Sequence, residues 1–151
     1  MTRPIVLLLS GPNLNLLGER EPEIYGTSTL AEHVAAARKE AERNGLDLEH
    51  VQSNGEADLV DAVQRARGRC AAIVVNAAAL THYAWALSDA LGTFEGPVVE
   101  LHISNPNARE AWRHTSVVTP VADGMIAGFG GHGYVLAMDA VARLLGHDGV
   151  S

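Results

Sequence analysis

Short apolar runs alternate with stretches of helical periodicity along this chain, and this alternation constrains its fold more than any other feature. Ile5–Leu9 is an unbroken apolar run, which is typical of a strand buried on both faces. Further strands are expected over residues 46–51, 71–75, 98–102 and 124–128. Helical spacing of apolar residues occupies the intervals, over residues 29–45, 53–67, 83–91 and 133–145. Strands separated by helices predict a parallel sheet with right-handed crossovers.

The number of strands narrows the architecture. Five strands within 151 residues suit a flavodoxin-like, doubly wound α/β fold, with a five-stranded parallel sheet and helices on both faces. We expect a single domain over residues 1–151. Ligands of such folds bind beyond the carboxyl ends of the strands. The loops that begin at Ser10, Asn76 and His102 are therefore the expected sites of function.

Two sequence signatures predict where helices begin. Thr29 and Glu32 have the spacing of a capping box, and so do Ser53 and Glu56. Gly45 is expected to end the first of these helices. Farther on, Thr81 or His82 is expected to begin the helix after the third strand.

Composition excludes several classes of function. The net charge of −7 argues against nucleic acid and against an anionic membrane surface as partners, because both need a basic footprint. Ile5–Leu9, the longest apolar run, is too short to cross a bilayer. The lone cysteine, Cys70, leaves no disulfide framework and fits a reducing, cytoplasmic location. Lys39 is the only lysine, so amine-based covalent catalysis would depend on that one residue.

The loop after the first strand carries groups suited to catalysis. It runs from Ser10 to Gly26, which is long for a connection between a strand and a helix. Along it lie an amide at Asn13, a guanidinium at Arg20 and a phenol at Tyr25. A loop that closes over a ligand and an ordinary surface loop fit this pattern equally well.

Polar residues also follow the third and fourth strands. Asn76 stands where the third strand exposes groups to a ligand, although on its own the residue is better explained as a cap of the strand. Glu100 and His102 are two residues apart and so share one face of a strand, where a carboxylate can orient an imidazole for acid catalysis. Arg109 and Arg113 are four apart, which predicts one helix face that recognises an oxyanion or hydroxyl-rich ligand, or else a solvated face.

Other motifs are read as structural. The glycine pattern Gly128–Gly133 matches dinucleotide spacing, but the acidic residue expected on a following strand about 20 positions later is missing. We therefore interpret it as a strand-to-helix turn. The histidines show no metal-binding spacing, and no metal is expected. Tyr134, Trp85 and Trp112 are expected to pack within helices.

Three stretches together resemble the type II 3-dehydroquinate dehydratase family. They are Gly11–Gly18 with Arg20-Glu21-Pro22 and Tyr25-Gly26, Asn76–His82 with Asp89-Ala90, and Glu100–Asn105 with Arg109-Glu110 and Arg113. The resemblance covers nearly the whole chain. It implies a cofactor-free hydro-lyase that converts 3-dehydroquinate to 3-dehydroshikimate through an enolate, in aromatic biosynthesis or in quinate breakdown.

The resemblance implies which residues remove the substrate proton and which stabilise the charge that forms. Tyr25 corresponds to the base that removes a proton from C2 of the substrate. Arg20 corresponds to the lid arginine that favours the tyrosinate, and Arg109 is expected to help it. Asn13 matches the amide that holds a water against the enolate oxygen. A phenol is a weak base at neutral pH, so such cations are a chemical requirement.

The resemblance also implies the acid and the binding groups. His102, oriented by Glu100, matches the acid that protonates the departing C1 hydroxyl. The remaining groups would hold the substrate: Asn76 and the backbone amides of Ile103 and Ser104 its carboxylate, and His82 and Arg113 its ring hydroxyls.

Asp89 corresponds to a residue that reaches the site of a neighbouring subunit, because the family assembles as dodecamers built from trimers. Some positions depart from the family pattern: Ala77–Ala79, Tyr83, Ala84, Asn107, Thr115 and Val117. None of them removes a catalytic group. Two other classes stay open from the residues, a binding protein for a cyclic hydroxy acid and an FMN-bearing electron carrier.

Overall fold

The fold is built on one parallel sheet, and the computed structural model of the chain describes residues 2–146. The strand order is β2-β1-β3-β4-β5, and every neighbouring pair is parallel. The strands are β1 (Ile5–Ser10), β2 (Asp47–Gln52), β3 (Ala72–Asn76), β4 (Val98–His102) and β5 (Gly124–Ala127). This is the strand order of flavodoxin-like folds, so the predicted fold class is confirmed.

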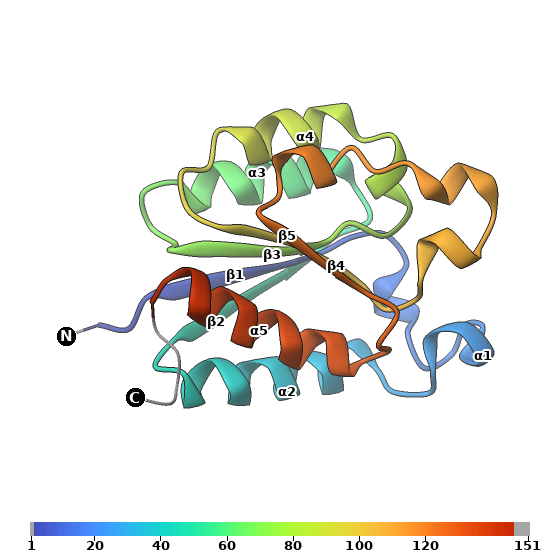
Figure 1. Cartoon of the computed structure of the whole chain (residues 1–151), viewed down its shortest axis with the longest axis horizontal. Helices are drawn as coiled ribbons and strands as arrows, with labels where there is room; N and C mark the ends of the chain where they lie inside the picture. The colour runs from blue at the N-terminus through green and yellow to red at the C-terminus, as the bar shows by residue number, and fades with distance from the viewer. Residues whose placement is uncertain (1, 147–151) are drawn as a thin grey trace.

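Helices cover both faces of the sheet (Figure 1). On one face, α2 (Leu30–Arg43) and α5 (His132–Leu144) pack on the even-numbered residues of β1, whereas α3 (Glu56–Ala66) and α4 (Trp85–Gly92) pack on its odd-numbered residues. Side chains alternate across a strand, so Val6 and Leu8 enter one core and Leu7 and Leu9 enter the other. A strand buried on both faces must be apolar at every position, as the first run is.

One of the two predicted capping boxes forms. Thr29 accepts a hydrogen bond from the backbone of Glu32, whose carboxylate accepts one from the backbone of Thr29. The prediction at Ser53 is wrong, because α3 begins at Glu56 with Gly55 as its N-cap. Ser53 instead donates to Asp58 at 2.6 Å.

The carboxylate that would close the second box has another partner. Glu56 accepts a hydrogen bond from the backbone N–H of Leu87 in α4, at 3.3 Å. A contact between two helices has thus replaced a local one, and the N-cap lies at Gly55, two residues later than the sequence signature predicts.

Short helical turns occupy the loops after β1 and β4. The loop after β1 contains a 3₁₀ helix (Leu14–Leu16) and α1 (Pro22–Tyr25). The predicted helix shared by Arg109 and Arg113 is wrong: Arg109 ends the 3₁₀ helix Pro106–Ala108, and Arg113 lies in a second one, Ala111–His114. Extended backbone at Arg109 separates the two turns.

The segment after β3 also departs from expectation. Thr81 and His82 lie in a 3₁₀ helix (Ala78–His82), and α4 begins only at Trp85. Trp85 and Trp112 do lie in helices, but they are 68% and 51% exposed, so the expectation that they are packing residues is wrong. Tyr134, by contrast, is fully buried.

Residues 128–131 form the expected turn between β5 and α5. Across residues 2–146, no helix is long and apolar enough to cross a membrane.

Candidate active site

A cavity of about 190 Å³ opens at the carboxyl end of the sheet. It is bordered by the loops after β1, β3 and β4, as the topology predicts. All but two of the predicted site residues line it: Asn13, Arg20, Tyr25, Asn76, His82, His102, Ile103, Ser104, Arg109 and Arg113. The exceptions are Glu100, which is buried beside His102, and Asp89, which is exposed on α4.

The loops after β1 and β3 are locked against each other at the edge of the cavity. The backbone N–H of Gly11 donates to the carbonyl of Asn76 at 2.8 Å. A Cβ at Gly11 would lie 2.4 Å from the carbonyl oxygen of Ala77, so only glycine allows this approach. The two loops that carry Asn13 and Asn76 are therefore held in fixed relation.

Tyr25 lies between two guanidinium groups. Arg109 Nη1 donates to its hydroxyl oxygen at 2.8 Å, and Arg20 Nη2 donates at 3.4 Å. Both guanidiniums also lie over the phenol ring, with their central carbons 4.6 Å (Arg20) and 5.2 Å (Arg109) from its centre. Charged donors on a phenolic oxygen stabilise negative charge there.

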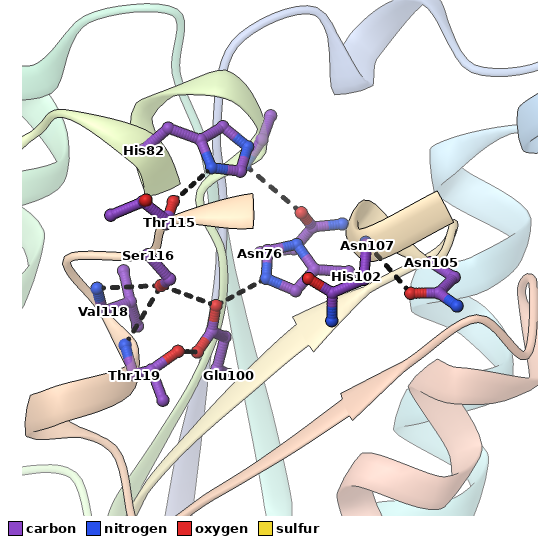
Figure 2. A network of polar contacts seen from close by, with 11 residues as sticks. Asn76, His82, Glu100, His102, Asn105, Asn107, Thr115, Ser116, Val118 and Thr119 are labelled. Atoms are coloured by element: carbon purple, nitrogen blue, oxygen red, sulfur yellow. Dashed lines mark hydrogen bonds and ion pairs between the residues drawn. The ribbon is translucent and has the colours of Figure 1, made fainter. Parts of the chain in front are cut away.

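His102 and Glu100 form a buried pair across one face of β4 (Figure 2). The distance from His102 Nε2 to Glu100 Oε2 is 2.6 Å. Because a carboxylate can only accept, Nε2 carries a proton and Nδ1 is left for other chemistry. Burial raises the pKa of Glu100, but the hydrogen bonds from His102 and Thr119 outweigh it and hold that pKa below its ordinary value.

His82 is presented to the cavity in a defined tautomer. Its Nδ1 lies 2.6 Å from the carbonyl oxygen of Thr115, so Nδ1 donates and Nε2 is the acceptor (Figure 2). Burial lowers the pKa of His82, and the hydrogen bond to Thr115 offsets only part of that effect. A neutral imidazole with an acceptor nitrogen suits a hydroxyl group of a ligand.

The side-chain amide of Asn76 is held by a hydrogen bond to Tyr134. Asn76 Nδ2 donates to the hydroxyl oxygen of Tyr134 at 3.2 Å, and the backbone N–H of Ala78 donates to Asn76 Oδ1 at 3.3 Å. Burial raises the pKa of Tyr134 to about 12, so this phenol stays neutral. One of the two N–H groups of the Asn76 amide is thereby committed, and its orientation is fixed.

The cavity is positively charged within an acidic protein. Three arginines and two histidines border it, and no carboxylate does so among the residues that the structure describes. Glu21 and Glu110 lie outside the rim, 3.9 Å from Arg20 and 2.5 Å from Arg113 respectively. The site thus combines a binding region for an anion, a phenol between cations and a carboxylate–imidazole pair, with no group of three or more metal-ligating side chains within residues 2–146.

The sequence pattern that defines the family Dehydroquinase class II matches residues 4–142. The chain belongs to this family.

Relatives of known name agree with that membership. This class II dehydroquinase is 53% identical over 138 residues to "3-dehydroquinate dehydratase 1" of Corynebacterium efficiens, which covers 91% of both chains. It is 51% identical over 144 residues to the 3-dehydroquinate dehydratase of Ruegeria pomeroyi, over 95% of this chain and 97% of the relative. The crystal structure of a type II dehydroquinase from Propionibacterium acnes superposes with a TM-score of 0.90, at 41% identity and over 94% and 98% of the two chains.

Three polar contacts of this dehydroquinase site were not predicted from the sequence. Ser116 and Thr119 both donate to Glu100, and Tyr134 binds Asn76. Tyr134 was expected only to pack, although a buried tyrosine hydroxyl usually finds a polar partner, and that signal was present. Ser116 and Thr119 carried no such signal. Their position beside Glu100 depends on the path of the chain after the 3₁₀ helix Ala111–His114.

Proposed function

We propose that this chain is a 3-dehydroquinate dehydratase whose base is Tyr25 and whose acid is His102. The observation that carries the proposal is the placement of the Tyr25 hydroxyl between two guanidiniums in the same cavity as the His102–Glu100 pair. Elimination of water from a β-hydroxy ketone needs a base at the carbon beside the ketone and an acid at the hydroxyl. Family membership specifies the substrate.

The reaction begins at Tyr25. Its phenolate takes the proton from C2 of 3-dehydroquinate, and the electron pair moves onto the C3 ketone oxygen as an enolate. Arg20 and Arg109 stabilise the phenolate before this step. A water held by Asn13 hydrogen-bonds the enolate oxygen, which is the electrostatic stabilisation that such an intermediate needs.

The reaction ends at His102. As the enolate collapses, the bond from C1 to its hydroxyl breaks, and His102 supplies the proton that makes the leaving group water. Glu100 orients the ring and balances the imidazolium charge. Protons move but the overall oxidation state does not change, so the step needs no redox cofactor.

The other cavity residues hold the substrate. Asn76 and the backbone amides of Ile103 and Ser104 bind its carboxylate, and His82 and Arg113 bind its ring hydroxyls. The neutral tautomer of His82 and the fixed amide of Asn76 support these roles. The local positive charge overcomes the repulsion that a net charge of −7 would exert on an anion.

The assembly is part of the proposal. Asp89 is exposed and lies outside the cavity of its own chain, which fits a role at the site of a neighbouring subunit in a dodecamer built from trimers. Native mass spectrometry of the purified protein tests this directly: a twelvefold mass is expected, and a monomer would contradict it. The lone cysteine supports a cytoplasmic location.

The activity is tested by mixing purified protein with 3-dehydroquinate and following absorbance of the conjugated enone product. The Lys39→Arg variant should keep full turnover, because Lys39 is exposed on α2 and no Schiff base is involved. No product at micromolar enzyme contradicts the proposal. A binding protein would show stabilisation by the substrate without turnover, and an electron carrier would purify yellow with FMN.

A further inference from the structure

The carboxylate of Glu100 receives three hydrogen bonds, and only one comes from His102 (Figure 2). Ser116 Oγ donates to Oε2 at 2.9 Å, and Thr119 Oγ1 donates to Oε1 at 2.5 Å. Glu100 itself is 1% exposed. A carboxylate removed from water to this degree stays ionised only when donors replace the lost solvent.

The proton of the Ser116 hydroxyl is directed by the backbone. Ser116 Oγ accepts hydrogen bonds from the N–H groups of Val118 and Thr119, each at 3.1 Å. With both acceptor positions filled, its only proton points to Glu100. The segment 116–119 is itself anchored to the 3₁₀ helix after β3, because the N–H of Val117 donates to the carbonyl of Thr81 at 2.8 Å. The Ser116 hydroxyl is thus oriented by the backbone to donate to Glu100.

Neither hydroxyl belongs to the substrate cavity. Ser116 and Thr119 are absent from its lining and instead line an adjoining hollow that His102 also borders. Any effect they have on the reaction must pass through Glu100. The titratable groups that face Glu100 are His102 on the same strand and His82 on the 3₁₀ helix after β3.

We propose that Ser116 and Thr119 are positioning residues that keep the proton of the pair on His102 and off Glu100. A buried carboxylate beside an imidazolium can exist as the ion pair or, after proton transfer, as two neutral groups. Two hydroxyl donors stabilise only the ionised carboxylate. They therefore favour the imidazolium form of His102, whose Nδ1 proton is acidic enough to pass to the leaving hydroxyl. This inference rests on the proposed function.

Thr119 offers matched variants. Thr119→Val removes the hydroxyl and keeps the shape of the side chain, whereas Thr119→Ser keeps the hydroxyl. We expect kcat of Thr119→Val to fall roughly ten- to hundredfold, the usual range for losing a hydrogen bond to a charged group. KM should stay within about twofold, because the cavity lining is intact. Thr119→Ser should restore kcat.

The pH profile separates this role from a structural one. Loss of a donor raises the pKa of the Glu100 carboxyl, so the activity of Thr119→Val should decline at a higher pH on the acid side than that of the wild type. Thr119→Ser should follow the wild-type profile. Thr93→Val, which removes a hydroxyl bonded to the carbonyl of Ala90 far from the site, should change neither kcat nor the profile.

A measurement without substrate keeps the inference separate from the proposed activity. Carbon-13 NMR of the Glu100 carboxyl, assigned with Glu100→Gln, reports its ionisation in the ligand-free protein. Its titration should move to higher pH in Thr119→Val and in Ser116→Ala, and not in Thr119→Ser. An unchanged titration and unchanged kcat in Thr119→Val would overturn the inference. A wild-type protein without turnover would overturn the proposed function alone, since the NMR result stands independently.

Discussion

At the residue scale, the site depends on pairs of side chains that the sequence places at different distances. Glu100 and His102 are two apart on one strand, so their contact could be predicted from strand geometry alone. The contact between Tyr25 and Arg109 spans 84 positions. From the residues alone it could not be predicted, because it depends on where two loops meet above the sheet.

Tyr134 gives a prediction at this scale. In Tyr134→Phe the Asn76 amide loses its buried acceptor, so the free energy of unfolding should fall by about 1–3 kcal/mol. KM for 3-dehydroquinate should rise, because the amide is no longer held in its binding orientation. Urea unfolding and steady-state kinetics measure the two effects.

The matched control is Tyr83→Phe, which removes a phenol hydroxyl from a side chain that is 58% exposed. It should leave stability and KM unchanged. If Tyr134→Phe behaved like this control, the proposed support of Asn76 would be wrong.

At the element scale, local signals predict helix ends only where no tertiary contact competes. The box at Thr29 forms as predicted. The box at Ser53 does not, because Glu56 binds α4 instead. The short helices between β4 and β5 follow no periodicity, and the chain that leaves them is held by hydrogen bonds to Glu100 and Thr81, which are distant in the sequence.

The packing of α2 against α5 gives a second prediction. A Cβ at Gly131 would lie 2.1 Å from the ring of His33, which stacks on Tyr134 at 5.0 Å between ring centres. Gly131→Ala should therefore lower the free energy of unfolding by about 1–3 kcal/mol through overpacking.

A double-mutant cycle tests the cause. His33→Ala removes the obstructing ring, so adding Gly131→Ala to His33→Ala should cost much less than adding it to the wild type. Equal costs in both backgrounds, measured by chemical denaturation, would show that the strain lies elsewhere.

At the scale of the whole molecule, the alternation of strands and helices predicts a five-stranded parallel sheet with helices on both faces, and the structure agrees. It also predicts which end of the sheet binds a ligand. Which apolar side chains on a helix remain exposed to solvent was not predictable. The expectation that Trp85 and Trp112 are packing residues failed for that reason. Helical periodicity indicates that a face is apolar and does not say whether this chain or another one covers it.

The pH dependence of stability is a prediction for the whole molecule. Burial lowers the pKa of His33 and of His50. The unfolded chain therefore takes up protons first as the pH falls through about 6.5. Stability should be complete above that pH and decline below it. Urea unfolding at pH 7.5 and pH 5.5 measures the loss, and His33→Gln should reduce it; a loss of the same size in that variant would exclude His33 as a source.

The central claim is that Tyr25, held between Arg20 and Arg109, is the base of a dehydratase. Its most direct test is kcat of Tyr25→Phe on 3-dehydroquinate, measured beside the wild type and with urea unfolding as the check on folding. The side chain is only partly buried, so stability should be nearly unchanged. Turnover should fall by about a hundredfold or more, the range for loss of a general base. Turnover close to that of the wild type would contradict the account.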